Sequence, residues 1–448
     1  MPPNAPTPPP VFQRRRARRL AVWNGAVWAI GNGLAGTTLV IYLARELHAE
    51  RLGLTVGLIV AAPRIAGLLR LGAPALIERI GDRKRFCVAC FLFSALMLSA
   101  LPWACVPGRL PTPAWSLSAL IVLWCLYHLL QYLGTVALWS WLADVAPTRI
   151  RGRFLGLRER WMVAGTAAAA IGVGLFIWYV SRYYPGLPAW IPYGIAAGIG
   201  AAFMFAALTP LILMPSMSPR PAATYPKTFH SPVRHSLKSL LSPFRDVRFL
   251  PLLLFGCWFS LFNGVTQSAQ RFFPVEVLGL PLLVMLSLET GSRLGRWTVS
   301  PRLGALADRF GNRPVMIVCQ LLVAAGLLFF VAATRAHWTW LVGAWVLWIA
   351  YAGLNVCLPN LMLKLSPRET NTSYIAAFEA VRGLCYAVSA IVGGQLVDHW
   401  RTCNVSLGCV EAQFFTVLFL FGWVTRSLGA AILLLVKEPA GQRADNRN

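Results

Sequence analysis

The chain has 448 residues, of which 57% are hydrophobic and only 13% are charged, about half the charged share of an average soluble domain. This composition excludes a soluble globular protein, because most residues must face something other than water. The net charge of +25 would suggest nucleic-acid binding in a soluble protein, so its distribution must be examined before its sign is interpreted.

The N-terminal residues are first proline-rich and then basic. The stretch MPPNAPTPPP precedes five arginines close to the first apolar run: Arg14, Arg15, Arg16, Arg18 and Arg19. Arginines beside a membrane span favour anionic lipid, so residues 1–20 are expected to form a basic cytoplasmic tail. No cleavable signal peptide is predicted, because the following span is too long for the hydrophobic region of one.

Apolar runs of about 20 residues recur along the whole chain, and each is long enough to cross the hydrocarbon of a bilayer as a helix. The runs are continuous rather than alternating, which argues against a transmembrane β-barrel. We therefore predict an all-α polytopic membrane protein with twelve transmembrane helices. They lie near residues 21–45, 54–77, 86–106, 115–142, 161–182, 190–215, 249–270, 280–304, 314–335, 337–363, 373–398 and 413–436.

The positive charge is distributed unevenly between these segments. Most of the 41 Lys and Arg residues fall on the side of the N-terminus, which predicts that both termini are cytoplasmic. The charge therefore reports topology and does not predict a nucleic-acid partner. We expect a monomer in the cytoplasmic (inner) membrane of a prokaryote, with a small-molecule substrate and membrane lipid as its partners.

The sequence contains an internal repeat. Three markers recur in the same order at spacings of 231, 230 and 220 positions: Asn32-Gly33 with Asn263-Gly264, Glu78 to Gly81 with Asp308 to Gly311, and Phe154 and Glu159 with Tyr374 and Glu379. They indicate two homologous six-helix halves, residues 21–215 and 249–436. Residues 216–248 are predicted to form a cytoplasmic linker with a short amphipathic helix, and residues 437–448 a cytoplasmic tail.

The loop segment GALADRFGNR, residues 304–313, resembles the signature G-x-L-a-D-r-x-G-r-r of the major facilitator superfamily, in its second-half position. With the repeat, the resemblance covers about residues 20–437. The first-half copy departs from the signature, with Glu78 in place of Asp and Pro74 in place of the first Gly. RIRGRFLG, residues 149–156, is similar to the R-G loop after the fourth helix of such transporters.

This resemblance implies two six-helix bundles related by a pseudo-two-fold axis, and transport by alternating access. The Gly-Pro signature of antiporters is not found in the fifth helix, which disfavours drug export by antiport. The resemblance also implies that the loops act as a latch, since a carboxylate at a helix end can accept backbone N–H groups and pair with Arg. The alternative is that their basic residues only fix topology. The latch residues would be Asp308, Arg309, Gly311, Glu78 and Arg79.

Several charged residues fall inside predicted spans, where one costs about 2.5 to 3.5 kcal/mol at mid-membrane. Arg64 and Arg293 lie 14 and 15 residues before the two loop carboxylates, or about 21 Å along a helix, in equivalent positions of the two halves. Glu289, Arg293 and Arg296 share one helix face at i, i+4 and i+7, and Glu379 and Arg382 are neighbours at i, i+3.

These residues predict a cavity for an anionic substrate, with Glu289 or Glu379 accepting a coupling proton. The substrate-binding residues would be Arg64, Arg293, Asn32, Asn263, Gln267 and Arg382. Alternatively, each Glu forms an intrabundle salt bridge with its neighbouring Arg, and the amides only join helices. Arg426 is expected to be an end residue that extends to the membrane surface.

Cys403 and Cys409 lie in RTCNVSLGC on the predicted outer side, where they either form a disulfide or remain free thiols. No metal-ligand spacing, Walker loop or nucleophile elbow is found, so we predict no metal, no cofactor and no enzyme activity. The predicted function is secondary active transport of a small anionic organic solute, with a proton as the candidate coupling ion. The alternatives are a drug or lipid extruder of the same fold, and a transporter-like receptor or assembly protein without transport.

Overall fold

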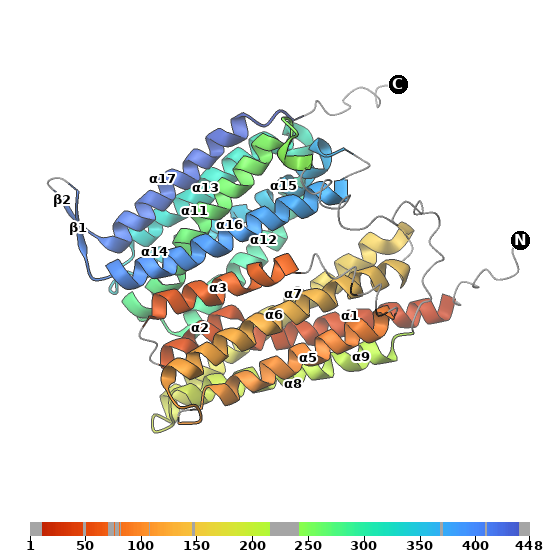
Figure 1. The fold of residues 1–448 in the computed structure, drawn as a ribbon, viewed down its shortest axis with the longest axis horizontal. Coiled ribbons are helices and arrows are strands. Elements are labelled where there is room, and N and C mark those ends of the chain that lie inside the picture. Colours follow the sequence, from red (N-terminus) through yellow and green to blue (C-terminus); the bar gives the residue numbers. More distant parts are fainter. Residues whose placement is uncertain are drawn as a thin grey trace, which may run out of the picture. The chain divides into compact units, whose positions relative to one another are not determined.

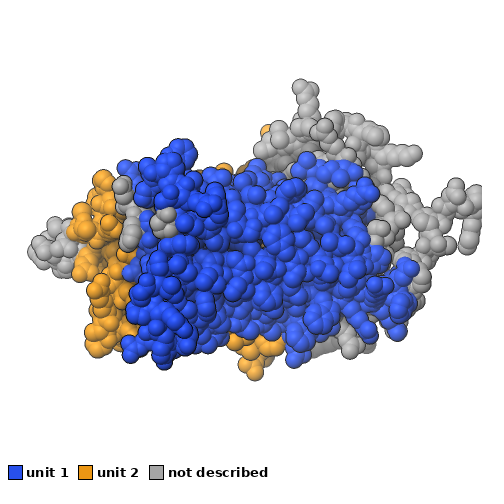
Figure 2. Space-filling model, turned by 90° about the horizontal axis from the view of Figure 1, so that it is seen from below, with its two compact units in different colours: residues 1–55, 62–230, 281–287 blue, residues 56–61, 231–280, 288–448 orange. Residues whose placement is uncertain are grey.

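The computed structural model describes residues 11–47, 51–69, 76, 80, 82–106, 108–145, 148–215, 242–367, 371–407 and 410–438. The chain divides into two compact units, shown in different colours in Figure 2. Unit 1 consists of Met1–Thr55, Ala62–His230 and Pro281–Ser287, and unit 2 of Val56–Ala61, Ser231–Leu280 and Leu288–Asn448.

The described part of unit 1 is helical (Figure 1). Helix α5 packs against α6, α1 packs against α7, and α8 contacts both α1 and α5. The helices are α1 (Val11–Leu34), α2 (Thr37–Glu46), α3 (Leu52–Leu69), α5 (Arg83–Ala104), α6 (Pro113–Val145), α7 (Thr148–Tyr183), α8 (Trp190–Ala206) and α9 (Leu208–Leu213). Residues Val56–Ala61 of α3 belong to unit 2.

Unit 2 repeats this pattern: α11 packs against α16 and α17, while α13 packs against α14, α15 and α17. An antiparallel pair of four-residue strands precedes the last helix, a small exception to the all-α prediction. The elements are η3 (Ser242–Phe244), α11 (Leu250–Phe272), the π-helical turn η4 (Phe273–Val277), α12 (Leu282–Phe310), α13 (Asn312–Ala332), α14 (Trp340–Leu347), η5 (Trp348–Ala350), α15 (Tyr351–Leu365), α16 (Asn371–Trp400), β1 (Asn404–Leu407), β2 (Val410–Gln413) and α17 (Phe414–Leu434).

Each of the twelve predicted apolar runs coincides with one helix or with two or three consecutive helical elements. In the described part of the chain, eleven helical segments are long and apolar enough to cross a membrane. The twelfth predicted span is α12, which at 29 residues is long enough but has charged residues along its length, at Glu289, Arg293, Arg296 and Arg302. The polytopic helical architecture is confirmed, and α12 is the predicted span whose apolar sequence these charges interrupt.

The repeat is visible in how the helices cross. A Cβ on Gly33 of α1 would lie 2.6 Å from the carbonyl oxygen of Thr166 on α7, and one on Gly264 of α11 would lie 2.6 Å from that of Tyr386 on α16. The two glycines are 231 positions apart and their two partners 220, the spacings of the sequence markers. Only glycine permits backbones to approach this closely, so both halves use one crossing in the same place.

A second pair of contacts follows the same two spacings. A Cβ on Gly25 would lie 2.9 Å from Nε of Arg158, and one on Gly256 would lie 2.5 Å from the ring of Phe378. Each pair again joins the first long helix of its unit to the helix that crosses it. Because two independent contacts agree, positions of α1 and α7 can be compared with positions of α11 and α16.

The segment GALADRFGNR, predicted to be a loop, is mostly helical, and this prediction was wrong in extent. Helix α12 continues to Phe310, and α13 begins two residues later at Asn312. The connection is Gly311 alone, whose φ of 96° lies in the left-handed region that favours glycine. The segment RIRGRFLG is likewise helical, within the first turns of α7, rather than a loop.

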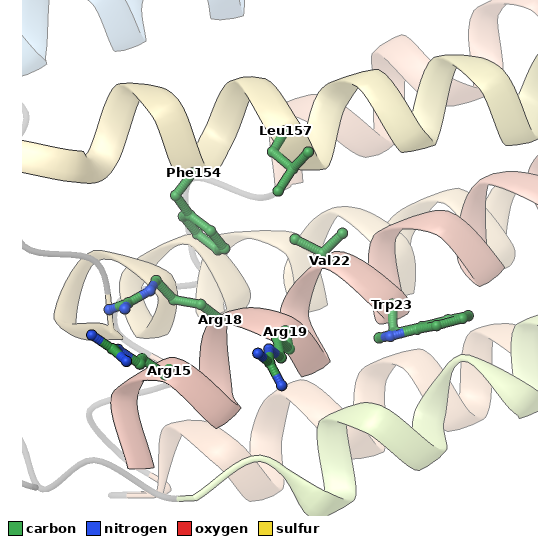
Figure 3. Close-up of a pocket in the computed structure, with 7 residues that line it drawn as sticks. All are labelled: Arg15, Arg18, Arg19, Val22, Trp23, Phe154 and Leu157. Atoms are coloured by element: carbon green, nitrogen blue, oxygen red, sulfur yellow. The ribbon is translucent and has the colours of Figure 1, made fainter. Parts of the chain in front are cut away.

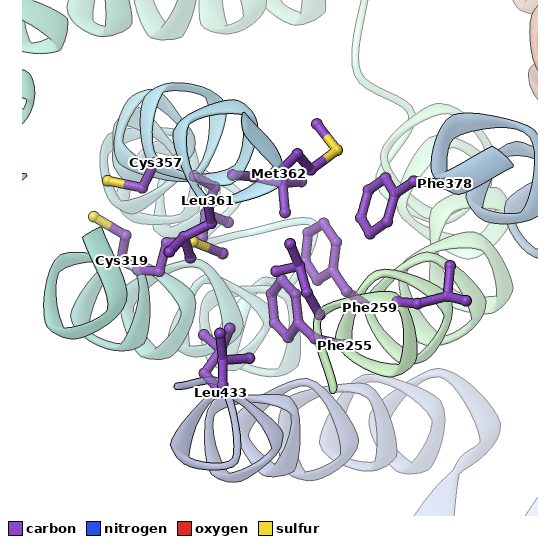
Figure 4. Packing of buried hydrophobic residues seen from close by; sticks show 14 of the residues in the cluster. Phe255, Phe259, Cys319, Cys357, Leu361, Met362, Phe378 and Leu433 are labelled. Atoms are coloured by element: carbon purple, nitrogen blue, oxygen red, sulfur yellow. The ribbon is translucent and has the colours of Figure 1, made fainter. Parts of the chain in front are cut away.

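Each unit has its own apolar core. The core of unit 2 joins α11, α13, α15, α16 and α17, with Phe255, Phe259, Phe378 and Leu433 at its centre (Figure 4). Cys319 and Cys357 lie in this core as small apolar side chains. The core of unit 1 gathers side chains of α1, α5, α6, α7 and α9, among them Ala21, Phe91, Leu138, Trp141, Phe154 and Leu211.

Candidate functional site

The carboxylate of Glu289 on α12 lies between two arginines of unit 2. Nη1 of Arg271, in the last turn of α11, donates to Oε1 of Glu289, and Nη2 of Arg293 lies 3.7 Å from Oε2. The Glu289 side chain is largely buried, whereas that of Arg293 is 47% exposed. The Glu289 carboxylate therefore contacts the more sheltered guanidinium of Arg271 and the more accessible guanidinium of Arg293.

The helical spacing accounts for this arrangement. Glu289, Arg293 and Arg296 lie on one face of a continuous helix, and the Nε of Arg296 donates to the carbonyl oxygen of Ser292 at 3.4 Å. Arg293 lies about 22 Å along the helix axis from Asp308, at a rise of about 1.5 Å per residue. The predicted i, i+4 contact of Glu289 with Arg293 is present, and Arg271 is an additional and closer partner.

The second predicted carboxylate is also paired. On α16, Nη2 of Arg382 donates to Oε2 of Glu379 at 2.7 Å, and both side chains are partly buried. The pairing is the salt bridge that was considered as the alternative to a role in transport. Because each Glu contacts an Arg that was predicted to bind substrate, the two interpretations are compatible.

Arg426 on α17 is fully buried, at 0% exposure, so the expectation that it extends to the membrane surface was wrong. Its Nη2 donates to Oγ1 of Thr266 and to the carbonyl oxygen of Asn263 at 3.4 Å, both on α11. Its Nε and Nη1 have no hydrogen-bond partner, and no carboxylate of the described residues pairs with it. Packing of α11 and α13 against this face of α17 prevents the side chain from reaching the surface.

Further polar groups surround this arginine. Nε2 of Gln320 on α13 donates to the carbonyl oxygen of Arg426 at 2.8 Å, and Nε2 of Gln270 donates to Oγ1 of Thr266 at 3.0 Å. Oε1 of Gln320 and Oδ1 of Asn263 are buried without a partner. Buried polar groups are usually satisfied, so this concentration of unpaired atoms makes these residues a candidate site.

Sequence reasoning missed Arg271, Thr266, Gln270 and Gln320. Two of them, Thr266 and Gln270, form with the predicted Asn263 a polar stripe on α11 at intervals of three and four residues in NGVTQSAQR. That periodicity could have identified these two. Gln267 is half-buried on the same helix, and no contact assigns it a role.

The predicted substrate residues are divided between the units. Arg64 is exposed on α3 and Asn32 is half-buried on α1, both in unit 1, whereas Arg293, Asn263, Gln267 and Arg382 belong to unit 2. Within unit 2, the structure brings Asn263 to Arg426 and Arg293 to Glu289. A cavity shared with Arg64 and Asn32 stays a prediction.

At the predicted second-half latch, the loop donors bind a carboxylate from elsewhere in unit 2. The backbone N–H groups of Asn312 and Arg313 donate to Glu438, just after α17, at 3.2 and 3.0 Å. Nζ of Lys364 on α15 and Nδ2 of Asn312 donate to the same carboxylate at 2.8 and 2.7 Å. Asp308, expected to accept such bonds, is exposed on the last turns of α12.

These contacts determine the acidity of Glu438. Burial alone would raise the pKa of its carboxyl, but hydrogen bonds from Lys364, Asn312 and Arg313 outweigh burial and lower the pKa to about 2. The carboxylate also lies at the N-terminus of α13, where the helix dipole favours negative charge. Arg309 is exposed and lies over the ring of Phe310, 5.2 Å from its centroid.

Several predicted residues lie outside the described part of the chain. They are Glu78 and Arg79 of the first-half latch, Cys409 of the predicted disulfide, and residues 216–241 of the linker. Cys403 is described and exposed. Among the described residues, no group of three or more His, Cys, Asp or Glu side chains could hold a metal ion.

Residues 290–446 match the family model of the Major Facilitator Superfamily. Solved structures extend the likeness to nearly the whole chain: a D-xylose-proton symporter is 18% identical with a TM-score of 0.67, over 96% of this chain and 98% of that one. The family match covers less than half of the chain, which is therefore similar to this superfamily in sequence over residues 290–446 and similar to these solved structures in fold.

Two further solved structures have a similar fold. The nucleoside transporter NupG is 16% identical with a TM-score of 0.63, over 95% of this chain and all of that chain. A bacterial homologue of the human lysosomal transporter Spinster is 13% identical with a TM-score of 0.62, over 96% of this chain and 95% of that one. No curated protein matches the sequence of this chain significantly. At these identities the likeness shows the fold alone.

Proposed function

We propose that this protein is a secondary transporter of the major facilitator type, which moves a small anionic organic solute together with a proton by alternating access. The observation that carries the proposal is the excess of arginine in the spans of unit 2. Away from the ends of these spans lie five arginines and two glutamates, while Glu276, Arg302, Lys364 and Asp398 lie nearer the ends. The seven residues are Arg271, Arg293, Arg296, Arg382, Arg426, Glu289 and Glu379. Intramembrane charges are costly, so an uncompensated positive excess favours an anionic ligand.

Glu289 offers a way to couple the anion to a proton. When Glu289 is ionised, its charge balances the guanidinium groups of Arg271 and Arg293. When it is protonated, Arg293 loses its partner, and its half-exposed guanidinium becomes available to a carboxylate or phosphate. Binding of the proton and the anion is then mutually favourable, which is the thermodynamic requirement for symport. Glu379 and Arg382 form a second pair that can work in the same way.

The other predicted residues complete the proposal. Asn263 and Gln267 of α11, with Asn32 and Arg64 of unit 1, would supply hydrogen bonds and charge to the substrate from both units, as alternating access requires. Both termini would face the cytoplasm of a prokaryotic cell, with the protein in its inner membrane, because most basic residues lie on that side.

The first test is replacement of Arg293, with Arg302 as a matched control on the same helix. A thermal-shift screen of carboxylates, phosphate esters and neutral solutes would identify a ligand that stabilises the folded protein. Arg293→Gln should then reduce uptake of that ligand into proteoliposomes by at least about 100-fold, the loss expected for one charged hydrogen-bonding partner of a desolvated anion. Arg302→Gln should transport normally. Full activity of Arg293→Gln at normal expression would contradict the proposal.

A second candidate function is extrusion of apolar compounds. An apolar groove of about 700 Å³ on unit 2 favours it, with walls from α12, α13 and η5, including Val299, Leu303, Phe310, Val318 and Ile349. In this alternative the arginines serve only as structural ion pairs. Transport of lipophilic dyes that survives both Arg293→Gln and Glu289→Gln would support extrusion and contradict anion symport.

A further inference from the structure

A groove in unit 1 lies between the first turns of α1 and the first turns of α7, with a volume of about 540 Å³ (Figure 3). Phe154 projects from α7 toward α1 at one side of it. Of the residues that the structure describes, seven line it, three of them arginines and none acidic: Arg15, Arg18, Arg19, Val22, Trp23, Phe154 and Leu157.

At the corresponding position in unit 2, two aromatic side chains pack against each other. At the spacings of the repeat, Arg18 corresponds to Phe249 and Phe154 to Tyr374. The ring of Phe249 packs edge-on against Tyr374, with centroids 4.9 Å apart, and both residues belong to the unit 2 core. The groove is therefore not a general consequence of the fold.

The charge at corresponding positions beside this groove also differs in sign between the two units. Arg15 corresponds to Asp246, which accepts a hydrogen bond from Oη of Tyr374 at 3.1 Å and so ties the two segments together. In unit 1 an arginine replaces the acid and Phe154 has no hydroxyl to donate. In unit 1 the same two helices therefore lie beside each other, but no hydrogen bond of this kind joins Arg15 to Phe154, and the groove between the helices carries positive charge.

The lengths of the two helices place the groove at a membrane surface. The span that contains α1 has 35 residues and α7 has 36, about 50 Å each, which exceeds the roughly 30 Å of hydrocarbon. Their basic ends therefore project into the headgroup region. Apolar side chains continue from the groove toward the hydrocarbon, with Trp23 65% and Leu157 48% exposed, and Trp161 exposed one turn further along α7.

We propose that this groove binds the phosphate headgroup of an anionic phospholipid. The guanidinium groups of Arg15, Arg18 and Arg19 match phosphate oxygens in charge and geometry. Trp23 has the amphipathic ring typical of the interface, and Leu157 offers contact to an acyl chain. A free phosphate would use the arginines but would leave this exposed apolar wall uncovered, so the lipid accounts for both parts of the groove.

Native mass spectrometry of the full chain in detergent tests the proposal with phosphatidylglycerol and phosphatidylcholine as probes. The first phosphatidylglycerol should bind on the order of 100-fold more weakly to a variant with Arg15, Arg18 and Arg19 replaced by Gln. A control variant removes three exposed arginines of unit 2, Arg245, Arg248 and Arg302, and should keep the affinity. Equal losses in the two variants, or equal affinity for both lipids, would overturn the proposal.

Leu157→Glu distinguishes a lipid from a soluble anion and leaves all arginines in place. Because Leu157 is exposed, the variant should fold, which its thermal unfolding would confirm. It should weaken phosphatidylglycerol binding about 10-fold by placing a carboxylate beside the headgroup and acyl chain. Inorganic phosphate at millimolar concentration should not displace the lipid. Displacement by phosphate, or an unchanged affinity of Leu157→Glu, would contradict a lipid site.

Discussion

In unit 1, Gly25 of α1 lies against the guanidinium of Arg158, whereas in unit 2 the corresponding Gly256 lies against the ring of Phe378. Phe378 is fully buried in an aromatic cluster with Phe249. Arg158 is only 6% exposed, its Nε has no hydrogen-bond partner, and its guanidinium lies 5.7 Å from the ring centroid of Trp139. The duplication has kept the close approach of the backbones while the side chains beside it have diverged.

The turns before α5 and α13 show the same divergence. In unit 1, Asp82 caps α5 locally by accepting from the N–H groups of Lys84 and Arg85. In unit 2, Glu438 performs this role for α13 from a position 125 residues further along the chain than Arg313. The first N–H groups of a helix need acceptors in both units, but only in unit 2 does the cap connect separate elements.

The largest effect is expected at the shared helix crossing. Gly264→Leu would force a side chain into the carbonyl oxygen of Tyr386, and Gly33→Leu would do the same at Thr166. We expect each to destabilise its unit by on the order of 3 kcal/mol or more and to abolish recovery of folded protein in detergent. Gly291→Leu, where nothing lies within 4 Å of the added Cβ, is the control. Tolerance of Leu at Gly33 alone would show that the units do not share this crossing.

Exchanging the residue types at Phe378 and Arg158 should change stability in opposite directions. Phe378→Arg would bury an unpaired charge in the unit 2 core and should cost about 3 to 5 kcal/mol. Arg158→Phe would remove a buried guanidinium beside Gly25, and should be neutral or stabilising. The melting temperatures of the two variants in detergent, each compared with that of the native chain, measure these effects. A large loss for Arg158→Phe would mean that unit 1 depends on this arginine.

The cap of α13 gives a pH-dependent effect. Glu438→Gln removes a charge held by Lys364 and two backbone N–H groups, and should cost about 1.5 to 3 kcal/mol. Because the folded-state pKa is lowered to about 2 from 4.5, this stabilisation is complete above pH 4.5 and is lost as the pH falls toward 2. The melting temperature of Glu438→Gln should therefore approach that of the native chain only in acid. Asp308→Asn, at an exposed carboxylate, should leave stability unchanged.

The smallest effect is expected at the local cap of unit 1. Asp82→Ala should cost about 1 kcal/mol, the usual value for a lost N-cap. Arg85→Gln removes only the 3.2 Å ion pair of an exposed arginine and should shift the melting temperature very little. If Asp82→Ala were as costly as Glu438→Gln, the distinction between a local and a connecting cap would fail.

Hydropathy predicted the spans, and helical spacing predicted the contacts of Glu289 with Arg293 and of Glu379 with Arg382, because both depend on local sequence. The partner of Glu289 on α11, Arg271, was missed because α11 continues to Phe272, beyond the predicted end of the span at residue 270. The burial of Arg426 was missed because hydropathy does not show which face of a helix is packed.

The role of Glu438 was missed for a different reason. Its contact with Asn312 spans 126 positions, and no local pattern indicates such a pair. The loop signature drew attention to Asp308 because it lies beside the turn, whereas the fold brings the end of α17 to the same donors. Contacts of this kind follow from tertiary packing and require a structure.

The most direct test of symport is to measure proton movement that the substrate drives. Proteoliposomes containing a pH-sensitive dye would be exposed to carboxylates and phosphate esters, with D-xylose and a nucleoside as neutral controls. Symport of an anion with a proton predicts internal acidification with at least one anion, none with the neutral solutes, and loss of the signal in Glu289→Gln while Arg302→Gln retains it. Acidification by a neutral solute alone, or an anion signal unaffected by Glu289→Gln, would contradict it.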